Sequence, residues 1–431
     1  MYRKIREELL QWKQNPYRKP LILQGARQVG KTYSILAFGR AEYANVAYFN
    51  FETAPSLAKT FDESLEPDYL LPLLSRICGQ TIIPEKTLIV FDEVQLCERA
   101  LTSLKYFCES APEYHIIVAG SLLGVAVNRE KFSFPVGKVD MITLRPMDME
   151  EFLLACGEQD LVNQIRNCFD TDAPMPAALH DAALGYYRQY LVVGGMPECV
   201  AKYLDTKDFI LLRHTQAMIL ESYLSDMSKY NQQNEIKKCR QAYGSVTVQL
   251  SKKNTRFQYK LVKKGARASE FENAIEWLAL SGIVSRVYRA EQPMKPLDNY
   301  IDIDSFKIYV SDVGLLCAKK EVDPEDVLYP AADLSDFRGG MTENYVCGQL
   351  IARGYTCHYW TSERGAEVDF ILQRDRQIIP IEVKSAENTK AKSLAVYKQT
   401  YSPAYAIKLC TKNFGFEDGK KTVPLYAAFC I

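Results

Sequence analysis

The chain has 431 residues, of which 47% are hydrophobic and 25% are charged, a balance that excludes a disordered or fibrous protein. Lysine plus arginine and aspartate plus glutamate both number 53, so binding to nucleic acid or membrane must come from a local patch rather than from net charge. At this length we expect roughly two to four domains.

The chain opens with a charged amphipathic helix at residues 1–13, and no later stretch approaches the roughly 18 apolar residues that a membrane span needs. The twelve cysteines contain no C-x-x-C pair, and the four histidines do not join them at zinc-ligand spacing. Free thiols in a reducing compartment are the simplest interpretation. We therefore expect a cytoplasmic protein that has no membrane span and no structural zinc.

Residues 1–150 alternate short apolar runs with polar helical stretches, which predicts an α/β fold with a parallel sheet. The expected strands are 21–25, 46–52, 87–93, 115–121 and 139–144. Apolar residues at helical spacing then predict a helical lid or subdomain over 151–230, interrupted by the GGMP turn at 194–197.

The rest of the chain predicts two further modules. Residues 231–335 mix short helices, a basic stretch and a hairpin, which favours a small winged-helix-like module. Residues 336–431 return to an α/β pattern, with a helix at 341–353 and strands at 367–373, 378–384 and 404–409. We expect this last segment to be a separate C-terminal domain.

The segment GARQVGKT at 25–32 matches the phosphate-binding pattern G-x-x-x-x-G-K-[ST] and lies between an expected strand and an expected helix. Backbone N–H groups at a helix N-terminus favour phosphate, and the two glycines let the loop wrap around it. Lys31 is expected at the β- and γ-phosphates of ATP and Thr32 at Mg²⁺. The predicted nucleotide-binding residues are Gly25, Ala26, Arg27, Gln28, Val29, Gly30, Lys31, Thr32, Tyr33 and Asp92.

The apolar run TLIVF ends at Asp92 and Glu93, where α/β sheets place ligand-binding groups. We interpret Asp92 as a second Mg²⁺-holding residue and Glu93 as the group that polarises the attacking water. The next expected strand ends at Ser121. Ser121 either hydrogen-bonds the γ-phosphate or the water, or is an ordinary turn serine.

With these motifs, the chain resembles the prokaryotic AAA-type ATPases that carry a C-terminal domain named DUF4143. The resemblance also rests on AGS (119–121), LRPMDMEEF (144–152), YLVVGGMPE (190–198) and FKIYVSDVGLL (306–316). It implies an ATP- and Mg²⁺-dependent enzyme and leaves a homo-oligomer open. Lys138 stands where the family has an arginine that senses or acts in trans, which puts that role in doubt, and Arg145 and Arg188 are weaker substitutes.

Residues 361–385 resemble the core of PD-(D/E)XK nucleases, which have the restriction-endonuclease-like fold. Two-residue alternation and hairpin pairing put Asp369, Glu382 and Lys384 on one face, and Glu343 matches the acidic residue on the first core helix of that family. The resemblance implies that Asp369 and Glu382 hold a divalent metal, Lys384 lies beside the nucleophile and Glu343 supports them. The alternatives are catalysis of DNA cleavage or retention of the fold for binding alone.

Residues 251–269 contain seven cations and no acidic residue, with Phe257 and Tyr259 between them. The cations are Lys252, Lys253, Arg256, Lys260, Lys263, Lys264 and Arg267. This composition suits phosphate contacts and base stacking on DNA, but it equally suits a solvated surface whose aromatic rings point into the core.

The sequence therefore supports two hypotheses. The first is an ATPase that couples its nucleotide state to a nuclease-like domain acting on or binding DNA. The second is a nucleotide-switched signalling or scaffold protein whose C-terminal domain recognises a partner without cutting.

Overall fold

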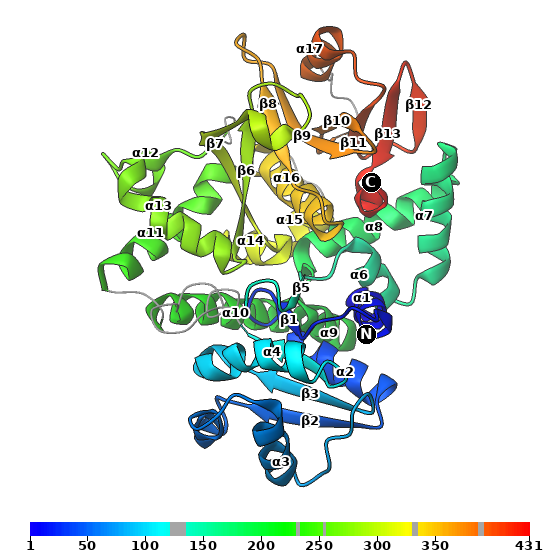
Figure 1. Ribbon diagram of the computed structural model, residues 1–431. Helices are drawn as coiled ribbons and strands as arrows, with labels where there is room; N and C mark the ends of the chain where they lie inside the picture. The colour runs from blue at the N-terminus through cyan, green and yellow to red at the C-terminus, as the bar shows by residue number, and fades with distance from the viewer. Residues whose placement is uncertain (121–134, 230–232, 253–255, 330–334, 387–391) are drawn as a thin grey trace. The chain divides into compact units, whose positions relative to one another are not determined.

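The computed structural model describes residues 1–120, 135–229, 233–252, 256–329, 335–386 and 392–431 (Figure 1). The chain divides into two compact units. The N-terminal unit comprises Arg3–Arg145 with Leu280–Gly282, and the C-terminal unit comprises Met1–Tyr2, Pro146–Ala279 and Ile283–Ile431.

The N-terminal unit is a five-stranded parallel sheet in the order β2-β3-β4-β1-β5 with helices packed on it. Its elements are α1 Ile5–Gln14, β1 Leu21–Gln24, α2 Lys31–Glu42, β2 Asn45–Asn50, η1 Pro55–Phe61, α3 Pro67–Cys78, β3 Thr87–Asp92, η2 Val94–Leu96, α4 Glu98–Ser110, β4 His115–Ala119 and β5 Asp140–Thr143. The five expected strands are thus confirmed, and this sheet is typical of a P-loop NTPase.

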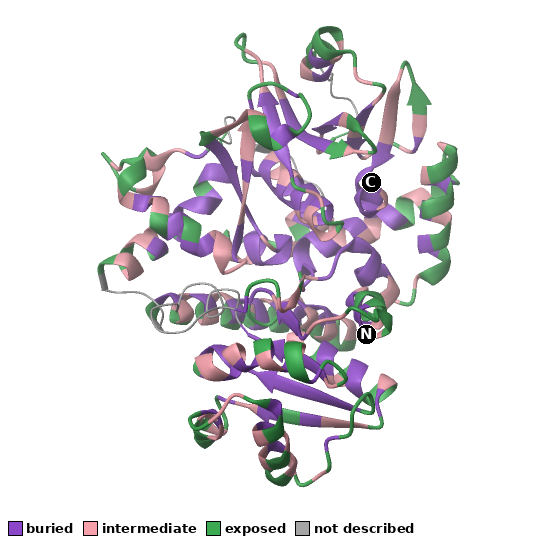
Figure 2. Ribbon diagram, viewed as in Figure 1, coloured by how far each residue is buried: buried purple, intermediate pink, exposed green. Residues whose placement is uncertain are grey.

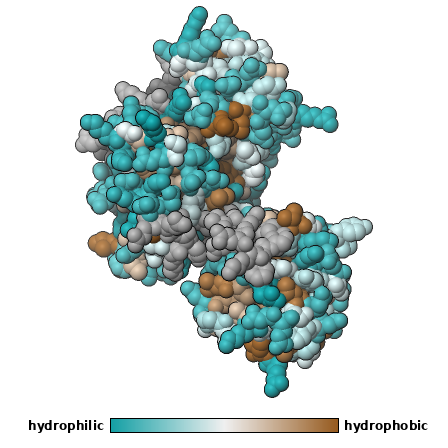
Figure 3. Space-filling model, turned by 60° about the vertical axis from the view of Figure 1, so that its left-hand side comes forward, coloured by the Kyte–Doolittle hydropathy of each residue, from teal (hydrophilic) through white to brown (hydrophobic). Residues whose placement is uncertain are grey.

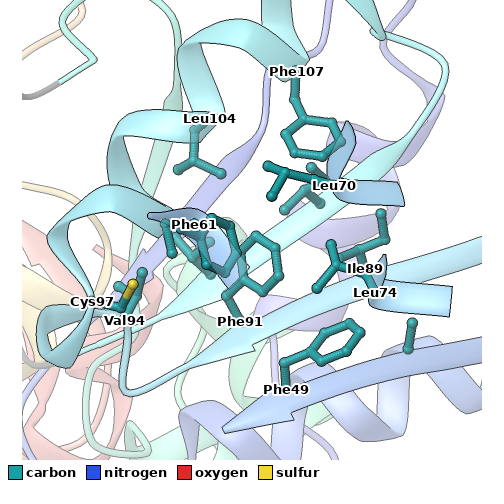
Figure 4. Close-up of a cluster of buried hydrophobic side chains, with 14 of the residues drawn as sticks. Phe49, Phe61, Leu70, Leu74, Ile89, Phe91, Val94, Cys97, Leu104 and Phe107 are labelled. Atoms are coloured by element: carbon teal, nitrogen blue, oxygen red, sulfur yellow. The ribbon is translucent and has the colours of Figure 1, made fainter. Parts of the chain in front are cut away.

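Aromatic side chains fill the core of the N-terminal unit between the sheet, α3 and α4. Figure 4 shows Phe91 between Phe61 and Phe49, with leucines of α3 and α4 beside these rings. The rings of Phe61 and Phe91 lie 5.7 Å apart at 85°, the edge-to-face arrangement that aromatic pairs prefer. Strands β3 and β4 are buried along their whole length, so their sequences read as continuous apolar runs (Figure 2).

The C-terminal unit contains an eight-stranded mixed sheet and most of the helices described. Its helical first part consists of α6 Met149–Ala155, α7 Gln159–Thr171, α8 Ala177–Val193, α9 Pro197–Thr206, α10 Phe209–Lys229, α11 Gln233–Leu250, α12 Tyr259–Val262 and α13 Ala268–Leu280. Its second part consists of β6 Val284–Ala290, η3 Leu297–Tyr300, β7 Ile301–Val310, α14 Val313–Lys319, α15 Pro324–Leu328, α16 Ser335–Ala352, β8 His358–Thr361, β9 Glu367–Arg374, β10 Gln377–Val383, α17 Lys392–Tyr401, β11 Ala406–Cys410, β12 Gly415–Glu417, β13 Lys420–Pro424 and η5 Leu425–Cys430.

The strand order of this second sheet differs from the expected arrangement of separate modules. The order is β12-β13-β11-β10-β9-β8-β6-β7, so the hairpin β6–β7 of segment 231–335 pairs through β8 with the strands of segment 336–431. The two segments therefore share one sheet. The segment expected as a lid, 151–230, also belongs to this unit, because Tyr187 and Tyr190 of α8 pack edge-on against Tyr345 of α16.

Three of the motifs that carried the family resemblance meet around Asp312, which caps the N-terminus of α14. One carboxylate oxygen of Asp312 accepts the Leu315 N–H at 2.8 Å and the other accepts the Gly195 N–H at 2.6 Å. The Gly195 carbonyl in turn accepts the Met147 N–H at 2.7 Å. A Cβ built on Gly195 would lie 2.0 Å from the Met147 carbonyl oxygen, so only glycine permits this approach.

Hydrophilic residues cover most of the described surface on the face shown in Figure 3, and apolar residues there form small separate patches. Within the described ranges, no helix is long and apolar enough to cross a membrane. All twelve cysteines are described and carry free thiols.

The close approach at Gly195 is testable by a pair of glycine substitutions. Gly195→Ala should lower the free energy of unfolding by about 1–3 kcal/mol or more, because the added methyl group overlaps the Met147 backbone. Gly185→Ala in α8 is the matched control, because no atom lies within 4 Å of its added Cβ and alanine favours a helix by roughly 0.5–1 kcal/mol. Urea denaturation of the full chain compares them. Equal denaturation midpoints for Gly195→Ala and wild type would contradict the close approach of Gly195 to the Met147 backbone.

Candidate functional site

The loop between β1 and α2 has the geometry that its glycines predict. Gly25 and Gly30 have φ values of +155° and +92°, and Gly30 is the residue before the first turn of α2. A Cβ on Gly25 would lie 2.2 Å from the Leu144 carbonyl oxygen, where the chain leaves β5. Ala26 and Val29 are buried, whereas Arg27, Gln28 and Tyr33 are exposed. The loop thus presents its backbone at a helix N-terminus, as a phosphate site requires.

Lys31 and Thr32 lie on the first turn of α2 and reach different partners. The Lys31 ammonium donates to the carbonyl oxygens of Gly25 and Ala26, both at 2.9 Å, and so lies within the loop. The Thr32 hydroxyl donates to Asp92 at 2.8 Å. Strands β1 and β3 are parallel members of one sheet, so their carboxyl ends bring the loop and Asp92 to the same edge.

Asp92 is buried and fully engaged by donors. One oxygen accepts the Thr32 hydroxyl and the Tyr48 hydroxyl, the latter at 2.7 Å, and the other accepts the Glu93 N–H at 3.0 Å. Burial raises the pKa of Tyr48 to about 12, so its phenol keeps its proton and remains a donor. Donors that fix both oxygens hold the carboxylate in one orientation, which suits a Mg²⁺ ligand.

Glu93 is half-buried and has a left-handed backbone, with φ +53°. Its carboxylate accepts a hydrogen bond from the side-chain amide of Gln95, which is itself buried. A residue other than glycine in this conformation is strained, and such strain is concentrated at functional sites. Glu93 is thus held beside Asp92 at the edge of the sheet.

The other residues considered for the nucleotide site are the serine after β4 and three basic residues. Ser121 lies outside the described residues. Lys138 forms an ion pair with Glu109 of α4 at 2.9 Å, and both side chains are about two-fifths exposed. The Arg145 backbone carbonyl accepts a hydrogen bond from Arg3, and Arg188 lies on α8 in the C-terminal unit.

In the C-terminal unit, a two-point clamp fixes α16 on β7. The side-chain amide of Asn344 accepts the Val310 N–H at 2.7 Å and donates to the Val310 carbonyl at 2.9 Å. The preceding residue, Glu343, then lies beside β7, where it accepts from Tyr309 at 3.1 Å and from Lys307 at 3.4 Å. Lys307 also pairs with Glu367 of β9 at 2.5 Å.

The other predicted residues lie next to this group. Asp369 of β9 accepts the Val383 N–H of β10 at 2.7 Å. Glu382 pairs with Lys384 at 2.5 Å, and its second oxygen, Oε2, is buried and has no hydrogen-bond partner among the described residues. The structure therefore brings Glu343, Asp369, Glu382 and Lys384 together, as the sequence predicts.

Burial and mutual repulsion dominate the electrostatics of this cluster. Burial raises the pKa of Asp369 well above its usual value, and the charges of Glu343 and Glu382 raise it further. Burial opposes the charge of Lys384, yet Asp369 and Glu382 more than offset this and raise its pKa. Among the described residues, no three His, Cys, Asp or Glu side chains are arranged to hold a metal by themselves.

The aromatic residues of the basic stretch point into the protein. Phe257 is buried and stacks on Phe306 of β7 with ring centroids 5.1 Å apart, and Tyr259 donates to Glu272 at 3.1 Å. Of the two alternatives for the aromatic rings, Phe257 therefore fits the one in which the ring packs in the core rather than on bases. Lys253 lies outside the described residues, and the six other cations are exposed: Lys252, Arg256, Lys260, Lys263, Lys264 and Arg267.

Comparison with known protein families identifies three domains along the chain. A family model described as an AAA domain matches residues 17–153. Models of two domains of unknown function, DUF8612 and DUF4143, match residues 184–326 and 338–428. The chain is an AAA-type P-loop ATPase with a C-terminal DUF4143 domain.

The AAA-type chain also shows distant likeness to solved structures. A Walker-type ATPase of Pyrococcus abyssi is 14% identical to this chain, with a TM-score of 0.44. The match covers 74% of this chain and 95% of the Pyrococcus chain. The ORC1 protein of Aeropyrum pernix in complex with DNA is 12% identical (74% and 91% covered, TM-score 0.28). AMPPCP-bound DnaA from Aquifex aeolicus is 14% identical (63% and 85% covered, TM-score 0.28). No curated protein matches the chain.

Several residues around the sites are not apparent from the sequence. In the AAA domain, Arg3 donates to the Val29 carbonyl of the loop at 2.9 Å, and Tyr48 and Gln95 orient the two acidic residues. In the C-terminal cluster, Lys307 and Glu367 are additional members. Lys307 does have a sequence signal, because it is a charged residue inside the apolar run FKIYV.

Separate substitutions distinguish nucleotide binding from turnover in the AAA domain. Lys31→Ala should abolish tight ATP binding because it removes the cation of the phosphate loop, whereas Glu93→Gln should keep ATP bound and reduce turnover by about 10²-fold or more. Lys59→Ala, an exposed lysine of η1, is the matched control and should change neither quantity. Fluorescent-nucleotide titration and phosphate release measure the two effects. Wild-type ATP affinity in Lys31→Ala would exclude the loop as the binding site.

Proposed function

We propose that the chain binds ATP at the loop 25–33 and hydrolyses it with Mg²⁺. The observation that carries this proposal is the Thr32–Asp92 hydrogen bond of 2.8 Å beside a loop whose backbone faces the N-terminus of α2. Thr32 and Asp92 would hold Mg²⁺, which supplies charge neutralisation at the phosphates when bound. Lys31 turns from the loop carbonyls to the phosphates, a step that exchanges two neutral acceptors for a charged one.

Glu93 is proposed as the residue that orients and polarises the attacking water. Gln95 supports this role because its amide donates to the Glu93 carboxylate and fixes its direction. Tyr48 keeps Asp92 in place as a ligand rather than as a competing base. On this proposal Asp92 binds Mg²⁺ and the adjacent Glu93 acts on the attacking water.

For the C-terminal domain we propose a nuclease-like site that acts on or binds DNA. Asp369 and Glu382 would hold a divalent metal, Lys384 would orient the water and offset developing charge, and Glu343 would support them. The support is the gathering of these four side chains from α16, β9, β10 and the residue that follows β10, together with Glu382 Oε2, which has no partner among the described residues.

A second candidate is recognition of a partner without cleavage. One observation favours it: Lys307 forms ion pairs with Glu343 and Glu367, so two of the cluster's carboxylates are engaged within the protein. On this proposal the nuclease-like fold is retained as a binding surface, and nucleotide state alone provides the switch.

Coupling between the two sites has a route along the chain itself. Leu144 touches Gly25 of the phosphate loop, and three residues later Met147 is clamped by Gly195, which Asp312 holds. Asp312 lies two residues after the end of β7, the strand that carries Lys307 and Tyr309. We propose that movement of the loop on nucleotide binding is transmitted through this peptide.

Cleavage and recognition are separated by incubating purified protein with DNA, Mg²⁺ and ATP and scoring phosphate release and strand breaks together. Metal-dependent strand breaks should fall by about 10²-fold or more in Lys384→Ala, because the cation beside the nucleophile is lost. Lys412→Ala, an exposed lysine of the same domain, should cut as wild type does. Phosphate release without strand breaks in wild type would favour recognition.

The basic stretch is proposed to contact DNA phosphates without base stacking. Replacing Lys252, Lys253, Lys263 and Lys264 with alanine should weaken binding to every DNA sequence and reduce the slope of log affinity against log salt by about one per lost contact. The control replaces four exposed lysines elsewhere, Lys59, Lys86, Lys202 and Lys237. Fluorescence anisotropy over a salt series measures the slopes. An unchanged slope in the first variant would make the stretch an ordinary solvated surface.

A further inference from the structure

Lys307 is the most deeply buried cation of the C-terminal cluster. Its side chain has no exposed surface, and its ammonium lies 2.5 Å from Glu367 and 3.4 Å from Glu343. The Tyr359 ring covers it with its centroid 5.1 Å from the ammonium. A lysine buried to this degree cannot reach a substrate, so its charge acts on the carboxylates around it.

Asp369 and Glu382 are the carboxylates that Lys307 does not contact directly. Each lies on the same hairpin, and each is at most 7% exposed. Asp369 is oriented by the Val383 N–H, while Glu382 Oε2 is buried without a partner. An unpartnered buried carboxylate oxygen costs folding free energy unless a cation or proton joins it.

The charges of the six groups favour one divalent ion. Glu343, Glu367, Asp369 and Glu382 bring four negative charges, and Lys307 and Lys384 bring two positive ones, which leaves two negative charges when all are ionised. One Mg²⁺ balances this excess, and two would leave an excess of positive charge. Magnesium sites commonly use one or two protein carboxylates together with waters and substrate phosphate oxygens.

We propose that Lys307 is a resident cation in the place of a second metal ion, so that the C-terminal cluster binds one divalent ion, on Asp369 and Glu382, rather than two. This inference rests on the proposed metal site of the nuclease-like domain. Lys307 is a positioning residue. It holds Glu343 and Glu367 as its own ion-pair partners and leaves Asp369 and Glu382 for the metal.

Counting bound Mn²⁺ in the full chain without nucleotide tests the proposal. Mn²⁺ prefers oxygen ligands as Mg²⁺ does, and its free concentration is measured by electron paramagnetic resonance. The C-terminal count is the number of ions that wild type binds beyond Asp369→Asn, so ions bound elsewhere cancel. We expect a difference of one. Lys307→Met should bind one ion more than wild type, because Glu343 and Glu367 lose their cation, whereas Lys412→Met should bind the wild-type number.

A difference of two ions between wild type and Asp369→Asn would overturn the role of Lys307 and leave the proposed metal site intact. A difference of zero would remove the metal site itself, and this inference with it. A folded Lys307→Met that binds the wild-type number would likewise contradict the proposal. The difference between wild type and Asp369→Asn separates one ion from two without Lys307→Met, so a Lys307→Met variant that fails to fold does not prevent the test.

Discussion

The hydrogen bond between the Asp312 carboxylate and the Gly195 backbone organises the C-terminal unit. It joins segments 117 residues apart in the sequence, and the same carboxylate caps α14. Burial raises the pKa of Asp312 to about 6, while the backbone N–H groups of Gly195, Leu315 and Gly314 oppose the increase. This buried acid is tolerated because three N–H groups converge on it, which requires glycine at 194 and 195, where a Cβ would meet Asp312 or Met147.

Both candidate sites also contain buried carboxylates, which need hydrogen-bond donors or cations in place of water. In the AAA domain, Asp92 is satisfied by a hydroxyl from α2, a phenol from β2 and the next backbone N–H. In the C-terminal cluster, the carboxylates outnumber the nearby ammonium groups, and Glu382 keeps an unpartnered oxygen. The first arrangement is complete within the protein, whereas the second calls for a further cation or proton.

Much of the fold followed from local sequence patterns. The strands at 21–24, 87–92 and 377–383 appear where apolar runs predicted them, and the loop at 25–32 appears where its glycines predicted it. Local patterns do not encode strand partners across modules, so the sharing of one sheet by β6, β7 and β8 was missed. A parallel pair such as β6 and β8 is set by long-range packing rather than by a turn sequence.

The candidate sites were predictable to a similar extent. Motif spacing identified Lys31, Thr32 and Asp92, and alternation in the hairpin identified Asp369 and Glu382. Arg3 and Tyr48 enter the AAA site from other elements, and no motif marks them, whereas Lys307 lies in a motif segment but its place in the cluster depends on long-range strand pairing. The orientation of Phe257 stayed open because composition alone does not distinguish an aromatic residue that faces solvent from one that packs on Phe306.

We propose that the nucleotide state of the AAA domain and DNA binding by the C-terminal domain are energetically coupled. Reciprocal titration of the full chain tests it most directly: DNA affinity is measured with a non-hydrolysable ATP analogue, with ADP and without nucleotide, and analogue affinity is measured with and without DNA. Coupled sites must change each other's affinity by the same factor, and we expect about 5–150-fold. DNA affinity that is identical in all three nucleotide states would contradict the claim.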